Sequence, residues 1–244
     1  MSAYEALAAS YDALTEDVEY QKRADYLEKL FRKSHTPVHT VLDLACGTGT
    51  MTWILTSRGY EMIAVDASRE MLSQAMAKTA PGIAPLFLCQ SMQKLDLYGT
   101  VDAAICCLDS INYLTRPADV RETFRRLHLF IAPGGLLVFD INTVEKLSAL
   151  DGQVFLDDTE DAYCVWRTEY RRGLCYYYMD IFQRDGDTWR RSFEEHRERG
   201  YTVEELTAWL REAGFTGIRT YGDGVLRTPK ENEQRIYFTA IRGK

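Results

Sequence analysis

The sequence predicts an α/β fold: a doubly wound, mostly parallel seven-stranded sheet with an antiparallel last strand, plus a small antiparallel β insertion. Three observations indicate it. Strand-like apolar runs alternate with helical segments up to about residue 150, which is the pattern of a parallel sheet covered by helices. From about residue 152 to 200 the helical period is absent, and Asp185-Gly186 is a strong hairpin signal. The last two strand-like runs have no helix between them, so they should pair antiparallel.

The individual elements follow from local signals. Pro37 separates two N-terminal amphipathic helices, over 3–14 and 19–33, from the first strand. Ser68 is a candidate N-cap, Pro117 opens a helix, and Thr202 begins a capping box, Thr-x-x-Glu. The helices expected after the first strand cover residues 50–58, 69–78, 117–131 and 203–213. The expected strands of the large sheet cover 41–44, 61–65, 86–89, 101–108, 136–141, 216–221 and 235–241, and those of the insertion cover 163–170, 174–184 and 188–198.

Composition and charge narrow the class of protein. With 244 residues and 46% hydrophobic residues, the chain fits a single large domain or a domain with an insertion. The net charge of −7 argues against a nucleic-acid-binding protein, although arginines gather between residues 167 and 199. Six cysteines without a C-x-x-C pair indicate reduced thiols, and four histidines without H-x-x-x-H disfavour a metal site. No apolar run reaches the roughly 18 residues of a membrane span and the N-terminus lacks a signal-peptide pattern, so we expect a cytoplasmic protein with no membrane partner.

The most informative segment is Val-Leu-Asp-Leu-Ala-Cys-Gly-Thr-Gly at residues 41–49. A buried strand carrying Asp43 turns through small residues into a helix, which is where open α/β sheets bind nucleotides. Asp66 ends the second strand roughly 20 residues later, where an acid can bind both ribose hydroxyls. Thr52 stands where the pyrophosphate fingerprint has its third glycine, so the pattern suits an adenosine ligand without phosphate. The alternative is an ordinary strand–turn–helix whose Gly47 and Gly49 only permit tight packing.

At these residues the chain resembles a family. D-L-A-C-G-T-G at 43–49 and V-D-A-S at 65–68 are similar to the first two motifs of class I S-adenosylmethionine-dependent methyltransferases, with Ala45 in the first glycine position. The similarity spans nearly the whole chain and includes C-L-D-S-I-N-Y at 107–113 and R-I-Y-F at 235–238. Those two segments look like the C-D-S-L-N-Y-L loop and the final R-I-Y/F-F strand of small bacterial methyltransferases with undefined acceptors. The resemblance implies S-adenosyl-L-methionine as the cofactor.

The resemblance also implies cofactor contacts residue by residue. Asp43 would meet the ammonium of the amino-acid tail, and Asp66 would hold the ribose. Tyr11 resembles part of an N-terminal Y-D element that closes over the cofactor, and its alternative is a hydrophobic anchor for the first helix. The family often has an acid where this chain has Ser91, so the adenine would be read by the Ser91 hydroxyl and the Met92 amide. The expected cofactor-binding residues are Tyr11, Asp43, Ala45, Gly47, Thr48, Gly49, Asp66, Ala67, Met71, Gln90, Ser91, Met92, Cys107 and Leu108.

The acceptor side is less defined by the sequence. The sulfonium methyl is already activated, so the protein must mainly align the acceptor and exclude water. A base is needed only for an acceptor that arrives protonated, and the catalytic candidates are Asp109, His196 and a tyrosine, Tyr177 or Tyr178. The alternative for His196 is a solvated strand residue beside two acids. Asp140 at the end of the fifth strand either satisfies loop backbone or touches substrate.

We therefore interpret the sequence as an S-adenosylmethionine-dependent methyltransferase acting on a nitrogen or oxygen of a small molecule. Three alternatives stay open: a nicotinamide-dependent oxidoreductase, an RNA-modifying methyltransferase that uses the insertion's arginines, and a cofactor-binding protein without turnover. The expected parts are an N-terminal helical cap (1–36), a cofactor-binding core (37–150), the β insertion (151–200) and the completion of the core (201–244). The insertion is expected to be a lid or substrate wall, with a homodimer interface as the alternative.

Overall fold

The computed structural model describes residues 8, 11–15 and 18–243, and for residues 13 and 14 it describes the backbone alone. The helices are α1 (Tyr11–Leu14), α2 (Tyr20–Phe31), α3 (Thr50–Ser57), α4 (Arg69–Ala77), α5 (Pro117–Phe130), α6 (Val144–Ala149) and α7 (Val203–Glu212), with short 3₁₀ helices η3 (Met92–Lys94) and η4 (Ser110–Tyr113). The strands are β1 (Thr40–Leu44), β2 (Glu61–Asp66), β3 (Leu86–Cys89), β4 (Val101–Cys106), β5 (Ile131–Asn142), β6 (Val154–Asp158), β7 (Ala162–Arg171), β8 (Leu174–Asp185), β9 (Thr188–Arg199), β10 (Phe215–Gly222) and β11 (Arg235–Arg242). Most of the helix predicted over 3–14 lies outside the described residues.

The large sheet has seven strands in the order β10-β11-β5-β4-β1-β2-β3. β1 to β5 pair parallel, so the carboxyl ends of these five strands meet at one edge of the sheet. β11 lies between β10 and β5 and runs antiparallel to both. The predicted doubly wound sheet with an antiparallel last strand is therefore confirmed, and ligand chemistry is expected at the carboxyl edge.

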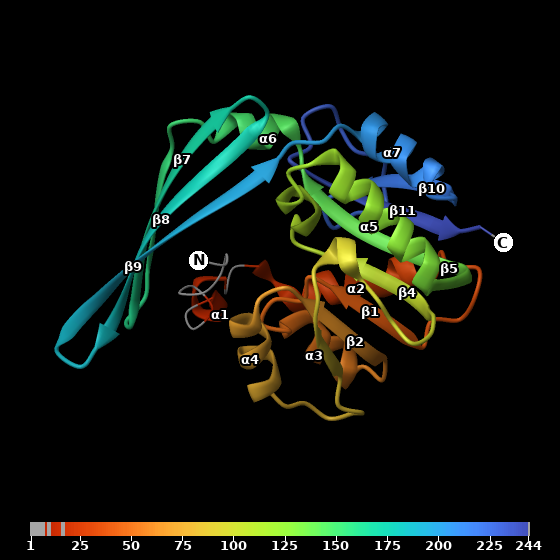
Figure 1. Cartoon of the computed structure of the whole chain (residues 1–244), viewed down its shortest axis with the longest axis horizontal. Coiled ribbons are helices and arrows are strands. Elements are labelled where there is room, and N and C mark those ends of the chain that lie inside the picture. The colour runs from red at the N-terminus through yellow and green to blue at the C-terminus, as the bar shows by residue number, and fades with distance from the viewer. Residues whose placement is uncertain (1–7, 9–10, 16–17, 244) are drawn as a thin grey trace.

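Helices cover both faces of this sheet (Figure 1). Alternation along β1 assigns the faces, because Leu42 belongs to one buried cluster and Val41 to the other. The first cluster contains Phe124 of α5 and Leu206 of α7, and the second contains Leu30 of α2. Both sides of the central strands are thus buried, which explains why these strands are continuous apolar runs in the sequence.

The β insertion forms a separate four-stranded antiparallel sheet in the order β6-β7-β8-β9, confirming a small antiparallel insertion. Figure 1 shows it as a long arm that leaves the core beside α6 and extends past the N-terminal segment. On β8 the face that carries Cys175, Met179 and Ile181 is buried. Met179 and Ile181 form a small cluster against which Tyr11 packs. The inner face of the arm is therefore turned toward the N-terminal segment.

Three local features differ from the sequence expectations. β6 is a fourth strand of the insertion, and it lacks alternation because Val154, Phe155 and Leu156 are all exposed. α6 has six residues, too few for a periodic pattern to reveal it. β5 starts at Ile131 and not at residue 136, so Pro133-Gly134-Gly135 lies within the strand, beside a register shift against β4.

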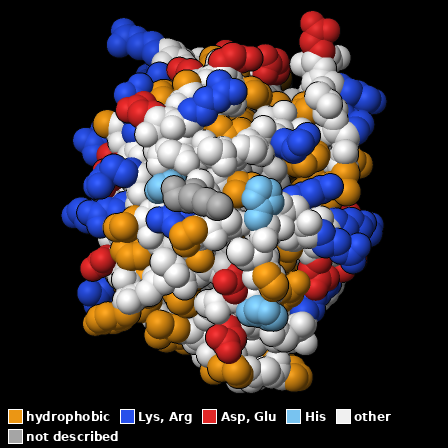
Figure 2. All heavy atoms as spheres, turned by 90° about the vertical axis from the view of Figure 1, so that its right-hand side faces the viewer, with side chains coloured by type: hydrophobic (Ala, Val, Ile, Leu, Met, Phe, Trp, Pro, Cys, Tyr) orange, Lys and Arg blue, Asp and Glu red, His pale blue; other side chains and the backbone are white. Residues whose placement is uncertain are grey.

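The surface opposite the arm mixes charges of both signs. Figure 2 shows Lys and Arg interspersed with Asp, Glu and apolar side chains on the face turned to the right in Figure 1. The six cysteines are free thiols, four of them buried, whereas Cys89 is exposed. Among the described residues, no helix is both long and apolar enough to span a membrane, and no three His, Cys, Asp or Glu side chains form a group that could hold a metal ion.

Candidate active site

A cavity of about 330 Å³ lies at the carboxyl edge of the sheet, within the range of roughly 300–1,000 Å³ that small-molecule sites occupy. It is built from the ends of β1, β2, β3 and β4, the turns that follow them, and the N-terminal segment. Its lining residues are Tyr11, Tyr20, Asp43, Ala45, Cys46, Gly47, Thr48, Thr50, Met51, Asp66, Ala67, Ser68, Met71, Gln90, Ser91, Met92, Gln93, Cys107, Leu108, Ser110, Tyr113 and Leu114. The structure thus brings the expected cofactor-binding residues together, with the exception of Gly49.

The turn after β1 uses its own backbone groups internally. Ala45, Gly47 and Gly49 all have positive φ (63°, 55° and 70°), which bends the chain sharply. The Cys46 N–H donates to the Val65 carbonyl at 3.0 Å, the Gly47 N–H to Asp66 Oδ2 at 2.8 Å, and the Gly49 N–H to the Cys46 carbonyl at 2.9 Å. These three N–H groups are therefore occupied and do not form a cradle for a phosphate.

Asp43 is a buried acid beneath this turn. It is 3% exposed, and Thr52 Oγ1 donates to its Oδ2 at 2.5 Å. Burial raises the pKa of Asp43 to about 6; the Thr52 hydrogen bond opposes the shift and the Asp66 charge adds to it. Thr52 occupies the position of the missing third glycine, so its hydroxyl supports the acid instead of permitting closer packing.

Asp66 connects the turn after β1, which contains Gly47, with the turn after β2, which contains Ser68. Its Oδ2 accepts the Gly47 N–H and its Oδ1 accepts the Ser68 N–H, both at 2.8 Å. Burial raises the pKa of Asp66, while the backbone hydrogen bonds oppose that rise. A carboxylate has about four lone-pair sites, more than these backbone N–H groups occupy, so a ligand diol can still be bound at this side chain.

An acid from the N-terminal segment lies at the beginning of α3. Asp12 Oδ1 accepts from Thr48 Oγ1 at 2.6 Å and from Thr50 Oγ1 at 3.2 Å. Asp12 Oδ2 lies 2.5 Å from Lys78 Nζ, which also donates to Thr50 Oγ1 at 2.8 Å. A carboxylate of the protein itself thus stands where a helix N-terminus would otherwise attract a phosphate. The adjacent Tyr11 lines the cavity, and burial raises its pKa.

The far wall of the cavity comes from the segment after β3. Ser91 is the N-cap of η3 and lines the cavity with Met92. The Gln90 side-chain amide is engaged by the backbone of Asp96: it donates to the Asp96 carbonyl at 3.1 Å and accepts the Asp96 N–H at 2.9 Å. Met71 is 2% exposed and still lines the cavity, so packing in the core and contact with a ligand are both consistent with its position.

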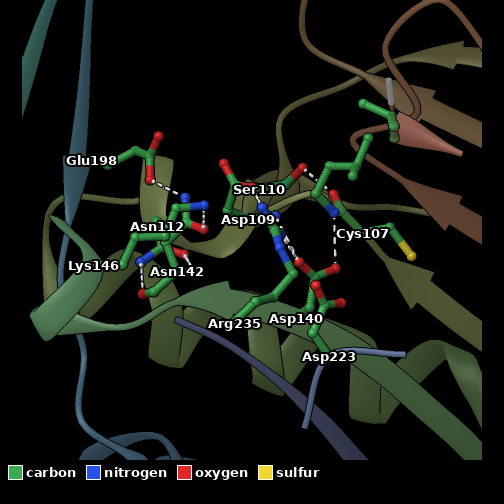
Figure 3. A network of polar contacts seen from close by, with 12 residues as sticks. Cys107, Asp109, Ser110, Asn112, Asp140, Asn142, Lys146, Glu198, Asp223 and Arg235 are labelled. Carbon is green, nitrogen blue, oxygen red and sulfur yellow. Dashed lines mark hydrogen bonds and ion pairs between the residues drawn. The ribbon is translucent and has the colours of Figure 1, made fainter. Parts of the chain in front are cut away.

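The opposite wall is held by a buried ionic network (Figure 3). Leu108 and Asp109 are consecutive left-handed residues with φ of 57° and 53°. Asp140 is fully buried and accepts both of their N–H groups, at 2.8 and 3.1 Å. Arg235 contacts the same Asp140 carboxylate and also donates to Asp109 Oδ1 at 2.6 Å. Burial opposes the charge on Arg235, but the two carboxylates hold its pKa well above the usual value.

His196 is buried on the inner face of β9 with an exposed fraction of 3%, so the interpretation as a solvated strand residue is wrong. Its Nε2 lies 2.7 Å from Oε2 of Glu194, which is 6% exposed. Its Nδ1 lies 3.5 Å from the hydroxyl of Tyr113, and the two rings meet edge to face. Tyr113 lines the cavity, so His196 reaches the cavity through this ring.

A second buried polar cluster ties the insertion to the core (Figure 3). Asn112 Nδ2 donates to the Asn142 carbonyl at 3.0 Å and to the Arg199 carbonyl at 2.8 Å. Asn142 Nδ2 donates to Glu198 Oε2 at 3.0 Å, and Lys146 Nζ donates to Asn142 Oδ1 at 2.8 Å. Burial, followed by the charge of Asp109, raises the pKa of Glu198 to about 8.

Comparisons with known proteins decide the family. A family model described as "Methyltransferase domain" matches residues 41–135. The Bacillus subtilis protein YqeM, which is named as a methyltransferase, is 31% identical over 245 residues, covering 99% of this chain and 98% of YqeM. An S-adenosylmethionine-dependent methyltransferase from Clostridium acetobutylicum superposes with a TM-score of 0.88 at 31% identity and 99% coverage of each chain. The chain belongs to the class I S-adenosylmethionine-dependent methyltransferases. The sugar N-methyltransferase KedS8 from a Streptoalloteichus species shares the fold, with a TM-score of 0.79 at 20% identity, covering 94% of this chain and 90% of KedS8.

The sequence pointed to most residues that line the cavity of this methyltransferase, but not to all the residues that hold those lining residues in place. Nothing in the comparisons supports the oxidoreductase, RNA-modifying or non-catalytic alternatives. Asp109 and His196 are not in the cavity lining, and Asp109 is engaged by Arg235. The supporting residues that sequence reasoning missed are Arg235 and Glu194. The R-I-Y-F segment was visible as a motif, but no local signal showed that its arginine pairs with two acids 95 and 126 residues away.

Proposed function

We propose that this chain uses S-adenosyl-L-methionine to methylate a nitrogen or oxygen of a small molecule. The observation that carries the proposal is that protein groups occupy the position where a dinucleotide's phosphates would bind. Asp12 stands at the N-terminus of α3, and the turn's N–H groups are bonded within the protein. A dinucleotide pyrophosphate would meet a carboxylate there, whereas an adenosine with an amino-acid tail has no such conflict.

The residues present fit that cofactor. Asp43 supplies a carboxylate for an ammonium, and Asp66 retains lone pairs for a diol. A Cβ built at Gly47 meets no atom within 4 Å, so the turn leaves open space for a close ligand. Ser91 and Met92 offer a hydroxyl and a backbone amide on the adenine side. When bound, the cofactor supplies a methyl group on a sulfonium that needs no further activation.

We propose a route by which the acceptor proton leaves, here called the proton exit. An amine or alcohol acceptor beside Tyr113 would lose its proton toward the Tyr113 hydroxyl and His196, with Glu194 orienting the ring and stabilising its positive charge. Asp109 is a weaker base candidate, because Arg235 holds its carboxylate. The likeness to a sugar N-methyltransferase supports a nitrogen acceptor for this chain.

The insertion is proposed to act as a wall or lid over the acceptor. Its inner face packs against Tyr11, and Tyr11 lines the cavity. His196, on the same inner face, reaches the cavity through Tyr113. An arm in this position would exclude water from the transferring methyl group, which is the main task left to the protein. In this proposal the chain consists of an N-terminal helical cap (1–36), a cofactor-binding core (37–150), the insertion (151–200) and the completion of the core (201–244).

The proposal is tested first by ligand choice. Calorimetry with S-adenosylhomocysteine and with NADH should show binding of the former and none of the latter. Metabolite pools supplied with S-adenosylmethionine should then release S-adenosylhomocysteine when the acceptor is present. Tight NADH binding without S-adenosylhomocysteine binding would overturn the proposal.

The proton exit is tested with His196→Gln. We expect a large loss of kcat with S-adenosylhomocysteine affinity unchanged, because His196 does not line the cavity. His39→Gln, at an exposed position before β1, is the matched control and should keep full activity. Unchanged kcat in His196→Gln would remove this residue from the mechanism.

A further inference from the structure

Arg235 connects elements that are remote from one another in the sequence. It begins β11, and its guanidinium contacts Asp140 at the end of β5 and Asp109 in the loop after β4. The Arg235 side chain is 12% exposed, that of Asp109 16% and that of Asp140 0%. A planar guanidinium can address two carboxylates at once, which a lysine ammonium cannot do with the same geometry.

The network holds the loop after β4 in an unfavourable backbone conformation. Leu108 and Asp109 both carry side chains and both adopt left-handed φ, a conformation that persists only where the surroundings enforce it. Asp140 enforces it by accepting the two consecutive N–H groups. Burial raises the pKa of Asp140, and the Arg235 charge opposes that rise, so Arg235 favours the ionised carboxylate, whose two oxygens are the stronger acceptors for these N–H groups.

The same loop forms one wall of the cavity. Cys107, Leu108 and Ser110 line it, and Ser110 Oγ donates to the Cys107 carbonyl at 2.8 Å. Figure 3 shows the chain between Cys107 and Ser110 passing directly above Asp140 and Arg235. Any relaxation of the left-handed pair would therefore move the backbone that a ligand must contact.

We propose that Arg235 is a positioning residue of this methyltransferase: by bridging Asp140 and Asp109 it locks the Leu108–Asp109 turn in the shape that receives the cofactor. This rests on the proposed function for the identity of the ligand, though not for the lock itself. Arg235 does not line the cavity, so its effect passes entirely through the loop.

The test compares Arg235→Met, Arg235→Lys and Asp109→Asn with the parent chain. Hydrogen exchange of a peptide covering 107–113, measured without ligand, reports the amides that Asp140 accepts. Calorimetry with S-adenosylhomocysteine, well below each melting temperature, reports the cavity. Arg227→Met is the matched control, since Arg227 pairs with Glu233 close to β11 but outside the cavity.

We expect Arg235→Met to raise exchange in the 107–113 peptide at least tenfold and to weaken S-adenosylhomocysteine at least tenfold. Arg235→Lys should give smaller changes in the same direction, because it keeps the charge and loses the fork. Arg227→Met should change neither quantity. Folded Arg235→Met with parental exchange and affinity within twofold of the parent would overturn the proposal.

Two other outcomes, a variant that does not fold and a parent chain that does not bind S-adenosylhomocysteine, can be distinguished from failure of this proposal. If Arg235→Met does not fold, Arg235→Lys and Asp109→Asn decide, since each retains one arm of the network. If both fold and leave exchange and affinity at the parental values, the proposal is overturned. If the parent does not bind S-adenosylhomocysteine, the proposed function fails, and the exchange measurement alone still supports or overturns the lock.

Discussion

The titration of Asp43 gives the sharpest prediction for the cofactor cavity. Burial raises its pKa from 3.8 to about 6. A shift of about two units corresponds to ~3 kcal/mol against ionisation, and the 3% exposure of Asp43 leaves little solvent screening to discount it. Because an ammonium pairs with the ionised form only, we expect S-adenosylhomocysteine affinity to rise with pH through about 6 and to level off above it.

The stability of the apoprotein follows the opposite course. Between about pH 4 and pH 6 the folded state holds a proton on Asp43 that the unfolded state has lost. The contribution of this group to the free energy of unfolding therefore falls as the pH rises through that window. It remains unfavourable by up to ~3 kcal/mol above it.

The assay is calorimetry of S-adenosylhomocysteine between pH 5 and 8 with circular dichroism at each pH. One unit below the midpoint a carboxyl is about one-tenth ionised, so affinity at pH 5 should be about tenfold below the plateau. Asp43→Asn should bind weakly and show no step. Asp66→Asn should keep the step with its midpoint lowered, because the Asp66 charge contributes to the raised pKa of Asp43. A parent affinity that stays flat over this range, or a step that persists in Asp43→Asn, would refute the reasoning.

Five further substitutions test neighbouring parts of the site. Asp66→Ala removes charge-assisted hydrogen bonds to the ribose, each worth roughly 1.5–3 kcal/mol, so calorimetry should show a loss of about 100-fold, and unchanged binding contradicts the assignment. Thr52→Val deletes the hydroxyl that lowers the pKa of Asp43, so the midpoint of the affinity step should move to higher pH. An unmoved midpoint would show that this hydrogen bond is unimportant. Ser91→Asp restores the acid common in the family and should preserve or tighten S-adenosylhomocysteine binding; a large loss would mean that this position does not face the adenine amine. Gly49→Ala places a Cβ 2.9 Å from an α4 side chain at φ 70° and should lower stability by about 1–3 kcal/mol in urea unfolding, whereas Gly47→Ala, with open space around it, should cost less; equal effects would contradict the packing argument.

The sequence could predict which residues gather at the cavity, because these residues lie near the ends of strands or directly after them. Asp43 and Asp66 each stand in a short apolar strand, and parallel strands bring their carboxyl ends together. Gly49 is the exception, since its missing Cβ serves contact with α4 and not the cavity. Tyr11 of the Y-D element lines the cavity, and only the structure shows that Asp12 lies at the start of α3.

The acceptor side could not be predicted to the same depth, because its contacts depend on tertiary packing. In the structure, His196 of β9 pairs directly with Tyr177 of β8. Alternation along a strand does not tell which face of the arm packs inward, so the burial of His196 and its pairing with Glu194 could not be predicted. Arg235 illustrates the same limit, because its two partners come from separate strand ends.

Asn112 shows why the arm and the cavity behave as one unit. It belongs to η4, whose Ser110 and Tyr113 line the cavity. Its amide donates to the Asn142 and Arg199 carbonyls and accepts the Asn142 N–H, so one fully buried side chain satisfies backbone groups of β5 and of the last strand of the arm. Because buried backbone groups must stay paired, the root of the arm cannot shift without moving η4. The arm is therefore attached to η4, and a change in its position would be transmitted to Tyr113 in the cavity wall.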